Sequence, residues 1–172
     1  KALKSYLSQG EKFSVVQAFQ IIKQVLFAVK EVHEAGFLHL DIQDGNVFIK
    51  GSLSEEDKLV SLVDFGAARP VCEDGLCPAI RDRALFSTIG FESPEIVGRN
   101  DGTLRLGAES DLYSVGYLLL LMLTGKRYTQ RELDSANIGL YLSKRKLKKL
   151  NCPAHMADKV HQIISKALKK TP

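Results

Sequence analysis

The chain has 172 residues, of which 45% are hydrophobic, and this is enough for one domain with a sizeable core. Its three cysteines have neither the number nor the spacing of a disulfide framework or a metal site, so we expect free thiols in a reducing, cytoplasmic environment. The longest apolar run, residues 115–123, is far shorter than the roughly 20 residues that span a bilayer. No signal peptide is recognised at the start, and we expect no membrane segment.

Basic residues are concentrated towards the C-terminus. Residues 126–172 hold 12 Lys and Arg against 3 Asp and Glu, a net charge of +9, whereas residues 1–125 have a net charge of −5. A basic end can bind nucleic acid or an acidic partner, but a solvated helix face is the simpler interpretation. No aromatic residue interleaves with the lysines of residues 144–149, so we expect no nucleic-acid partner.

Two helices are predicted at the N-terminal end. Residues 1–9 indicate a short helix that ends at Gly10. Ser14, with Gln17 three residues later, is a capping-box signal for a second helix, and Gly36 is placed to end it. A mostly apolar stripe recurs at steps of three and four over about five turns, which puts it on one helix face: Val15, Phe19, Ile22, Leu26, Val29 and His33.

A small β-hairpin is predicted next. Residues 47–50 and 59–63 have the composition of short strands, and the polar, turn-rich residues 51–57 separate them. Residues 67–95 then combine prolines and mixed charge with no sustained period, so we expect a long irregular segment. A loop of this length inside a compact domain is usually functional or disordered.

Residues 110–124 are predicted to form a buried helix. Ser110 is placed to cap its N-terminus, and Asp111 in the first turn is favourable for the helix dipole. Residues 115–123 are apolar on almost every face, which is the pattern of a helix buried all round. Gly125 is placed to end it.

Two further helices are predicted at the C-terminal end. Residues 135–150 indicate a weaker amphipathic helix with a lysine face, and Pro153 suits the first turn of a last helix. The apolar face of that last helix is expected to hold Met156, Val160, Ile163, Ala167 and Leu168. The whole pattern predicts a mainly α fold with a small β-hairpin, built around the buried helix at 110–124.

The chemically informative residues flank the hairpin. Asp41 is followed five residues later by Asn46, just before the first strand, and Asp64 follows the second strand. The hairpin would hold these three side chains near one point. Such a set suits a site that orders a hydroxyl group and holds Mg²⁺ against phosphates, because Mg²⁺ takes oxygen ligands and usually only one or two carboxylates.

Four segments in this order resemble motifs of the protein kinase superfamily, of the eukaryotic-like Ser/Thr type. Residues 39–46, HLDIQDGN, resemble the catalytic loop H-R-D-x-x-x-x-N, and residues 62–66, LVDFG, resemble the D-F-G motif. Residues 88–95, TIGFESPE, are similar to the A-P-E segment. Residues 111–116, DLYSVG, are similar to the start of the large central helix of the family.

The resemblance implies that residues 1–172 are the C-terminal lobe of a kinase domain and that residues 64–95 are its activation segment. The Gly-rich loop, the strand lysine and the helix glutamate that precede these motifs in the family have no counterpart in the sequence. We therefore expect a fragment without the N-terminal lobe, inactive or nearly so by itself. The parent protein would supply that lobe and the missing half of the ATP cleft.

The resemblance also implies roles for single residues. Asp41 would orient the acceptor hydroxyl or accept its proton, while Asn46 and Asp64 would hold Mg²⁺ on the phosphates of ATP. Phe48 matches the residue whose side chain lies under the adenine. Thr88 matches the threonine that contacts the catalytic aspartate in Ser/Thr kinases, which favours Ser or Thr of a protein substrate as the acceptor.

Two departures from the family concern regulation and charge. Leu40 replaces the Arg that normally pairs with a phosphorylated residue of the activation segment, and residues 67–85 contain no Ser, Thr or Tyr. Together they predict that the segment is not switched by phosphorylation there. Gln43, which we count among the catalytic residues, replaces a Lys that helps to neutralise the transferred phosphate. Neutral hydrogen bonds are weaker than charged ones, so lower activity or an unusual acceptor is expected.

Four other positions have lesser implications. His39 is implied to be a packed structural residue with Phe65 beside it. Ser93, in place of the Ala of A-P-E, is expected to be benign. Glu95 would pair in the family with an Arg that should follow the end of this sequence.

Two other functions stay open. A pseudokinase or binding module would use the lobe as a docking surface, and Leu40 and Gln43 favour this mildly, whereas the intact Asp41, Asn46 and Asp64 oppose it. A small-molecule kinase of the aminoglycoside or choline type has a similar H-G-D-x-x-x-x-N loop. The segments SPE and DLYSVG disfavour that class, which lacks this pair.

Overall fold

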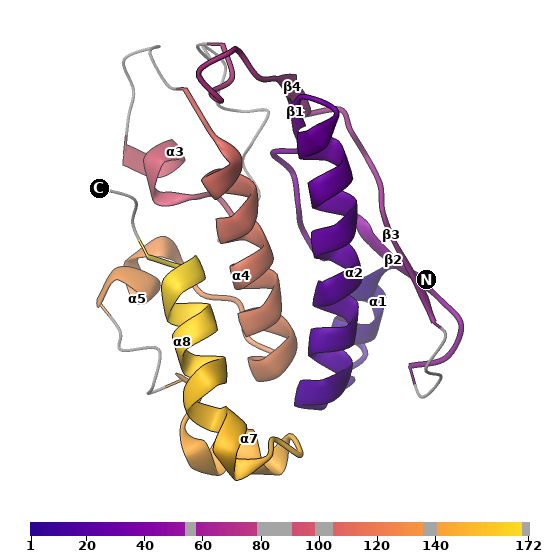
Figure 1. Cartoon of the computed structure of the whole chain (residues 1–172). Coiled ribbons are helices and arrows are strands. Elements are labelled where there is room, and N and C mark those ends of the chain that lie inside the picture. The colour runs from indigo at the N-terminus through magenta and orange to yellow at the C-terminus, as the bar shows by residue number, and fades with distance from the viewer. Residues whose placement is uncertain (54–57, 79–90, 99–104, 136–140, 170–172) are drawn as a thin grey trace.

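The computed structural model describes residues 1–53, 58–78, 91–98, 105–135 and 141–169. Its elements form a mainly α fold with little β structure, as predicted (Figure 1). In chain order they are α1 (Leu3–Ser8), α2 (Val15–Glu34), β1 (Phe37–Leu38), β2 (Val47–Lys50), β3 (Leu59–Leu62), β4 (Arg69–Pro70), α3 (Pro94–Gly98), α4 (Ala108–Thr124), α5 (Gln130–Ser135), α7 (Lys144–Lys149), the 3₁₀ helix η2 (Ala154–Met156) and α8 (Ala157–Ala167). Among the described residues, no helix is long and apolar enough to cross a membrane.

Helix α4 is the centre of the molecule, with α2 on one side and α8 on the other (Figure 1). Its side chains are buried almost without interruption from Tyr113 to Leu123, as the all-round apolar pattern predicted. Gly125 ends the helix in the left-handed conformation, at φ +65°. The predicted start at Ser110 was wrong, because α4 begins at Ala108, and Gly107 takes the capping position without a side-chain bond.

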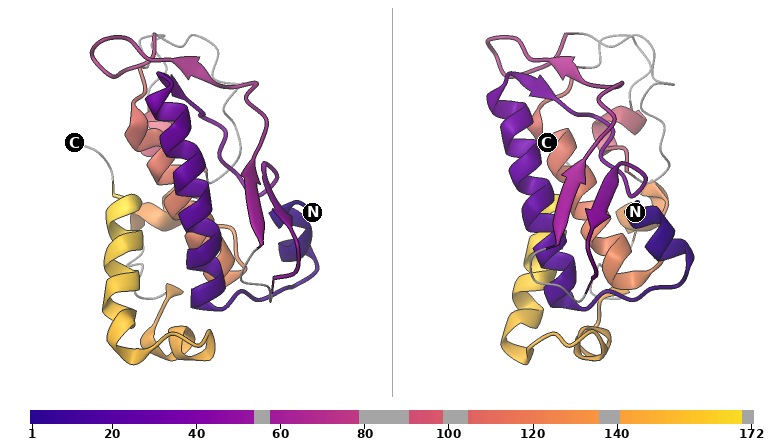
Figure 2. Two further views of the ribbon diagram at one scale, coloured as in Figure 1. Left: turned by 45° about the vertical axis from the view of Figure 1, so that its right-hand side comes forward. Right: turned by 90° about the vertical axis from the view of Figure 1, so that its right-hand side faces the viewer.

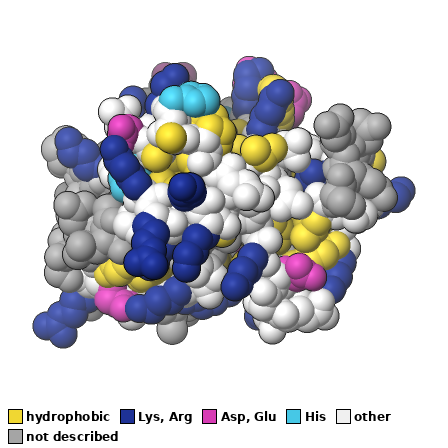
Figure 3. Space-filling view, turned by 90° about the horizontal axis from the view of Figure 1, so that it is seen from below, with side chains coloured by type: hydrophobic (Ala, Val, Ile, Leu, Met, Phe, Trp, Pro, Cys, Tyr) yellow, Lys and Arg dark blue, Asp and Glu magenta, His cyan; other side chains and the backbone are white. Residues whose placement is uncertain are grey.

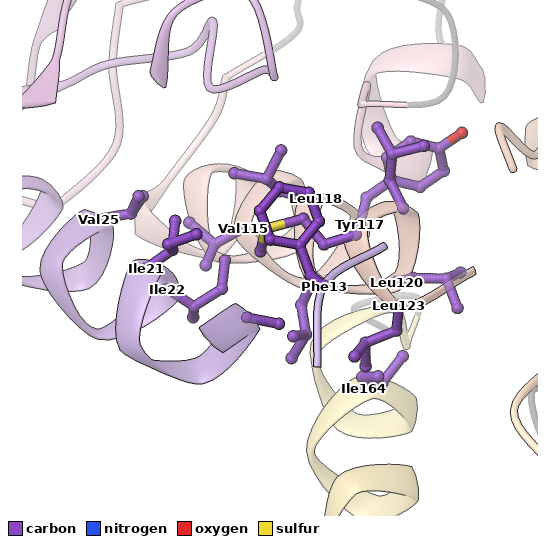
Figure 4. Packing of buried hydrophobic residues seen from close by; sticks show 14 of the residues in the cluster. Phe13, Ile21, Ile22, Val25, Val115, Tyr117, Leu118, Leu120, Leu123 and Ile164 are labelled. Carbon is purple, nitrogen blue, oxygen red and sulfur yellow. The ribbon is translucent and has the colours of Figure 1, made fainter. Parts of the chain in front are cut away.

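Helix α2 begins as its capping box predicted. The Ser14 hydroxyl accepts a 3.2 Å hydrogen bond from the Gln17 N–H, and the Ser14 N–H donates to Oε1 of Gln17 over 2.9 Å. The buried face of the helix packs against α4. Figure 4 shows Ile21, Ile22 and Val25 of α2 beside Val115 and Leu118 of α4 in the main core.

The predicted hairpin is present. β2 and β3 are antiparallel, with Val47 opposite Leu62 and Lys50 opposite Leu59. The hairpin lies along α2, on the side away from α8 (Figure 2). A second pair, β1 with β4, was not predicted: Leu38 pairs with Arg69 at the start of the segment that was expected to be irregular.

The C-terminal end differs from its prediction. A single helix over 135–150 was wrong, since α5 ends at Ser135 and α7 begins only after Ser143, whose hydroxyl caps it by accepting from the Lys146 N–H. Residues 136–140 lie outside the described residues. Pro153 precedes η2, and α8 then buries Ala157, Val160 and Ile164, whereas Ile163 is 49% exposed.

Candidate active site

The segment from His39 to Asn46 crosses from β1 to β2 and is fixed to the start of α4 (Figure 2). The Asp111 carboxylate accepts hydrogen bonds from the backbone N–H of His39 at 2.9 Å and of Leu40 at 2.8 Å. Its Oδ2 also lies 2.7 Å from Nε2 of His33, at the end of α2. Asp111 is fully buried. It therefore joins α2, α4 and the loop at one point, in addition to its predicted place in the first turn of α4.

Leu40 is buried in a second, smaller apolar core. Its backbone is left-handed, at φ +61°, a conformation that is uncommon for a residue with a branched side chain. The core is formed by Leu38, Leu40, Ala67, Cys77, Ile96 and Leu106. The described start of the segment 64–95 is thus held by apolar packing at the position where the family has a charged Arg. Cys77 reinforces this contact, because its N–H donates to the Leu106 carbonyl over 2.8 Å.

The Asp41 carboxylate is oriented by two neutral amides. Nε2 of Gln43 donates to Oδ1 of Asp41 over 2.7 Å, and Nδ2 of Asn46 donates to Oδ2 over 2.7 Å. The same Asn46 nitrogen also donates to the Asp41 carbonyl at 2.9 Å, which closes the loop on itself. Three of the residues predicted for the site are therefore in direct contact.

The hairpin brings Asn46 and Asp64 to its open end. The Val63 N–H donates to the Asn46 carbonyl over 2.9 Å, and Asp64 is the next residue along the chain. Asp64 has the left-handed φ of +66° and is exposed, and its Oδ1 accepts a 3.2 Å hydrogen bond from the Gly66 N–H. Because the Asn46 amide nitrogen donates to Asp41, the amide oxygen is the Asn46 atom that could serve as a metal ligand. An amide oxygen and a carboxylate are hard ligands, and this pair fits Mg²⁺ on a phosphate.

His39 and Phe65 pack on each other as predicted, with ring centroids 4.8 Å apart. His39 is fully buried, and its Nδ1 accepts a 3.3 Å hydrogen bond from the Asp41 N–H. Burial lowers the pKa of His39 below its ordinary value of 6.5, against the opposing pull of the Asp111 and Asp41 carboxylates. A neutral ring fits the geometry, because a protonated Nδ1 could not accept that bond.

The remaining predicted residues are placed differently. Phe48 is on the outward face of β2, opposite Ser61, and is 42% exposed, so its ring is open to a partner. Thr88 lies outside the described residues. Ser93 is buried, and its hydroxyl has no hydrogen-bond partner among the described residues. Glu95 accepts a 2.8 Å hydrogen bond from the Ser110 hydroxyl.

Sequence reasoning missed an ion pair beside the site. Both Asp44 carboxylate oxygens lie 2.7 Å from one guanidinium nitrogen of Arg127, and the Asp44 side chain is only 2% exposed. The guanidinium also lies over the Phe91 ring, 5.6 Å from its centroid. The pair ties the loop to the segment after α4. No local sequence pattern indicates this ion pair, because its partners are 83 residues apart.

Comparison with known proteins agrees with this geometry. A family model described as the protein kinase domain matches residues 1–172, so the chain belongs to the protein kinase family. It is similar to the probable serine/threonine-protein kinase PknB of Lactococcus lactis, with 29% identity over 72% of this chain and 18% of the relative. It is also similar to the serine/threonine-protein kinase PLK4 of Nematostella vectensis, with 28% identity over 95% of this chain and 15% of the relative. The probable serine/threonine-protein kinase zyg-1 of Caenorhabditis briggsae is 33% identical over 72% of this chain and 16% of the relative. The chain thus spans less than a fifth of the length of these relatives.

Proposed function

We propose that this chain carries the catalytic loop of a protein kinase that transfers the γ-phosphoryl group of ATP to Ser or Thr of a protein substrate. The observation that carries the proposal is the Asp41 carboxylate, held between Gln43 and Asn46 beside the open end of the hairpin. The names of the relatives, all serine/threonine-protein kinases, support the acceptor class. In this proposal residues 64–95 are the activation segment of a C-terminal lobe.

The proposed roles follow from the contacts. Asp41 orients the acceptor hydroxyl and takes its proton, because hydrogen bonds to both of its oxygens fix its direction. Asn46 and Asp64 hold Mg²⁺, and Phe48 presents an open ring to the adenine. When bound, Mg²⁺–ATP supplies the phosphoryl group and the cation that screens its charge. The Gly-rich loop and its lysine would come from the N-terminal lobe of the parent protein.

Two contacts support a segment that needs no phosphate to hold it. Leu40 contributes apolar packing where the family has a phosphate-binding Arg. Arg105 forms a two-bonded ion pair with Asp74, at 2.7 Å and 3.0 Å. Together they hold the described start of the segment without a phosphate group.

The test is phosphoryl transfer by the full-length protein, with radiolabelled ATP, Mg²⁺ and a protein acceptor. Label should appear on Ser or Thr, and Asp41→Asn should abolish it, because the amide cannot take the proton. Asp158→Asn is the matched control, since Asp158 is an exposed surface residue of α8 paired with Lys144. It should retain full activity.

The same assay separates the other functions. Label on choline or an aminoglycoside instead of protein would show a small-molecule kinase. Absence of transfer by folded protein that binds Mg²⁺–ATP would show a binding module. Gln43 and Leu40 are the observations that keep this second candidate open, because neither brings a positive charge to the site.

A further inference from the structure

A hollow lies where α4 ends, at the lower end of the molecule as oriented in Figure 1, and none of the candidate site residues Asp41, Asn46 and Asp64 lines it. The turn before α2, the end of α4, and α7 line this hollow, which has a volume of about 520 Å³. Its accessible apolar lining, here called the floor, comes mainly from the half-buried Leu7 and Leu150, because Met122 and Leu123 also line the hollow but are only 2% and 5% exposed. Figure 3 looks onto this end and shows hydrophobic side chains between many Lys and Arg side chains.

The rim of the hollow is strongly basic. Lys12, Lys126, Lys146 and Lys149 line it, against Glu11 as the one acidic lining residue among those described. Lys126 is neutralised by Glu132, at 3.2 Å. The other three lysines have no ion pair within the described part of the chain, and all three are exposed. An apolar floor inside a ring of unpaired positive charge fits a ligand that presents an apolar group flanked by negative charges.

We propose that this hollow binds an acidic segment of a partner protein, in which Asp or Glu residues flank an aliphatic side chain. The aliphatic side chain would fill the floor, and the carboxylates would reach Lys12, Lys146 and Lys149. Charge complementarity of this kind fixes which partners bind and speeds their encounter. Burial of the aliphatic side chain would add to the affinity through the hydrophobic effect.

The aromatic residue in the lining favours a protein ligand over a nucleic acid. Single-stranded nucleic acid binds through bases that stack on exposed aromatic rings. Tyr128 is the aromatic residue that lines the hollow, but it is only 3% exposed. Its ring already packs on Tyr141, with centroids 4.2 Å apart. The half-buried side chains of Leu7 and Leu150 suit an aliphatic anchor better than a base.

The hollow shares no lining residue with the candidate active site, although Arg127, which pairs with Asp44 of the loop, lies between its lining residues Lys126 and Tyr128. Asp111 contacts the catalytic loop at the start of α4, whereas Thr124 lines the hollow at the other end. A rise of about 1.5 Å per residue puts these two ends roughly 20 Å apart. Binding at the hollow therefore does not depend on the proposed phosphoryl transfer, and a binding assay tests it alone.

The experiment selects short random peptides, displayed on phage, for binding to the full-length protein. Lys146→Glu/Lys149→Glu reverses two charges on the rim. Arg145→Glu/Lys148→Glu is the matched control, because it makes the same charge change on the exposed side of the same helix, outside the hollow. Circular dichroism would verify that both variants fold. A fluorescent copy of the best selected peptide, and a copy with its aliphatic residue changed to Ser, would then be titrated.

The expected result is enrichment of peptides in which acidic residues surround an aliphatic one. Affinity should fall about tenfold with the rim variant and with the Ser peptide, but little with the control variant. Equal loss in both variants would overturn the proposal, because it would show unspecific attraction to a basic surface. So would enrichment of non-acidic peptides, tighter binding of single-stranded RNA, or self-association of the protein that the rim variant abolishes.

Discussion

The side-chain amide of Gln43 donates a 2.7 Å hydrogen bond to Oδ1 of Asp41. The family has a lysine at this position, and Gln43 reaches the same carboxylate without bringing a charge. In the proposed function the loop would therefore orient Asp41 but screen a transferred phosphate poorly.

Gln43→Lys should accelerate phosphoryl transfer in the full-length protein about tenfold, because charge-assisted hydrogen bonds are roughly twice as strong as neutral ones. The measurement is kcat from initial rates at saturating ATP. Gln43→Met, of similar length but without a donor, is the control and should lower the rate. A Lys variant no faster than the wild type would show that charge at this position does not limit the reaction.

Asp111→Asn should destabilise the fold by about 2 kcal/mol or more. The buried carboxylate accepts two backbone N–H groups, and an amide nitrogen would face one of them as a second donor. Urea unfolding followed by circular dichroism measures the loss. Glu109→Gln removes a charge from the same helix turn at an exposed position and should change stability by less than about 0.5 kcal/mol. Equal effects of the two changes would mean that only the helix dipole is involved.

His39 should make the fold less stable in mild acid. Burial lowers its pKa, so below about pH 6.5 the unfolded chain takes up a proton that the folded chain does not. The part of the stability that depends on a neutral His39 is therefore fully present above that pH. It is lost as pH falls towards the lowered pKa, by at most about 1.4 kcal/mol per pH unit. Urea midpoints between about pH 7.5 and 5 for the wild type and His39→Phe give the difference. An identical pH dependence in both proteins would refute a buried neutral histidine.

Local patterns in the sequence predicted the structure correctly where residues close together in the chain determine it. The capping box of Ser14 and Gln17 and the all-round apolar run of α4 are of this kind. Contacts across long separations were not predictable, and Asp44 with Arg127 is an example. On α8 the chain offers Ile163 and Ile164 in succession, and only the tertiary packing against α4 decides that Ile164 is buried. In the site, the motif located Asp41 and Asn46, but the hydrogen bonds between them depend on how the loop folds.

Gly116 is required by the close approach of α4 and α8. A Cβ placed on it would lie 2.5 Å from the Cβ of Ala167. Alanine favours a helix over glycine by roughly 1 kcal/mol, yet Gly116→Ala should destabilise the fold by about 1–3 kcal/mol, because the two helices must separate.

Ala167→Gly supplies the matched test of this contact. By itself it should cost up to about 1 kcal/mol in helix propensity, but combined with Gly116→Ala it removes the opposing methyl group. The double variant should therefore be more stable than Gly116→Ala, a non-additivity that a double-mutant cycle in urea measures directly. Simple additivity of the two changes would mean that the helices do not meet at this pair.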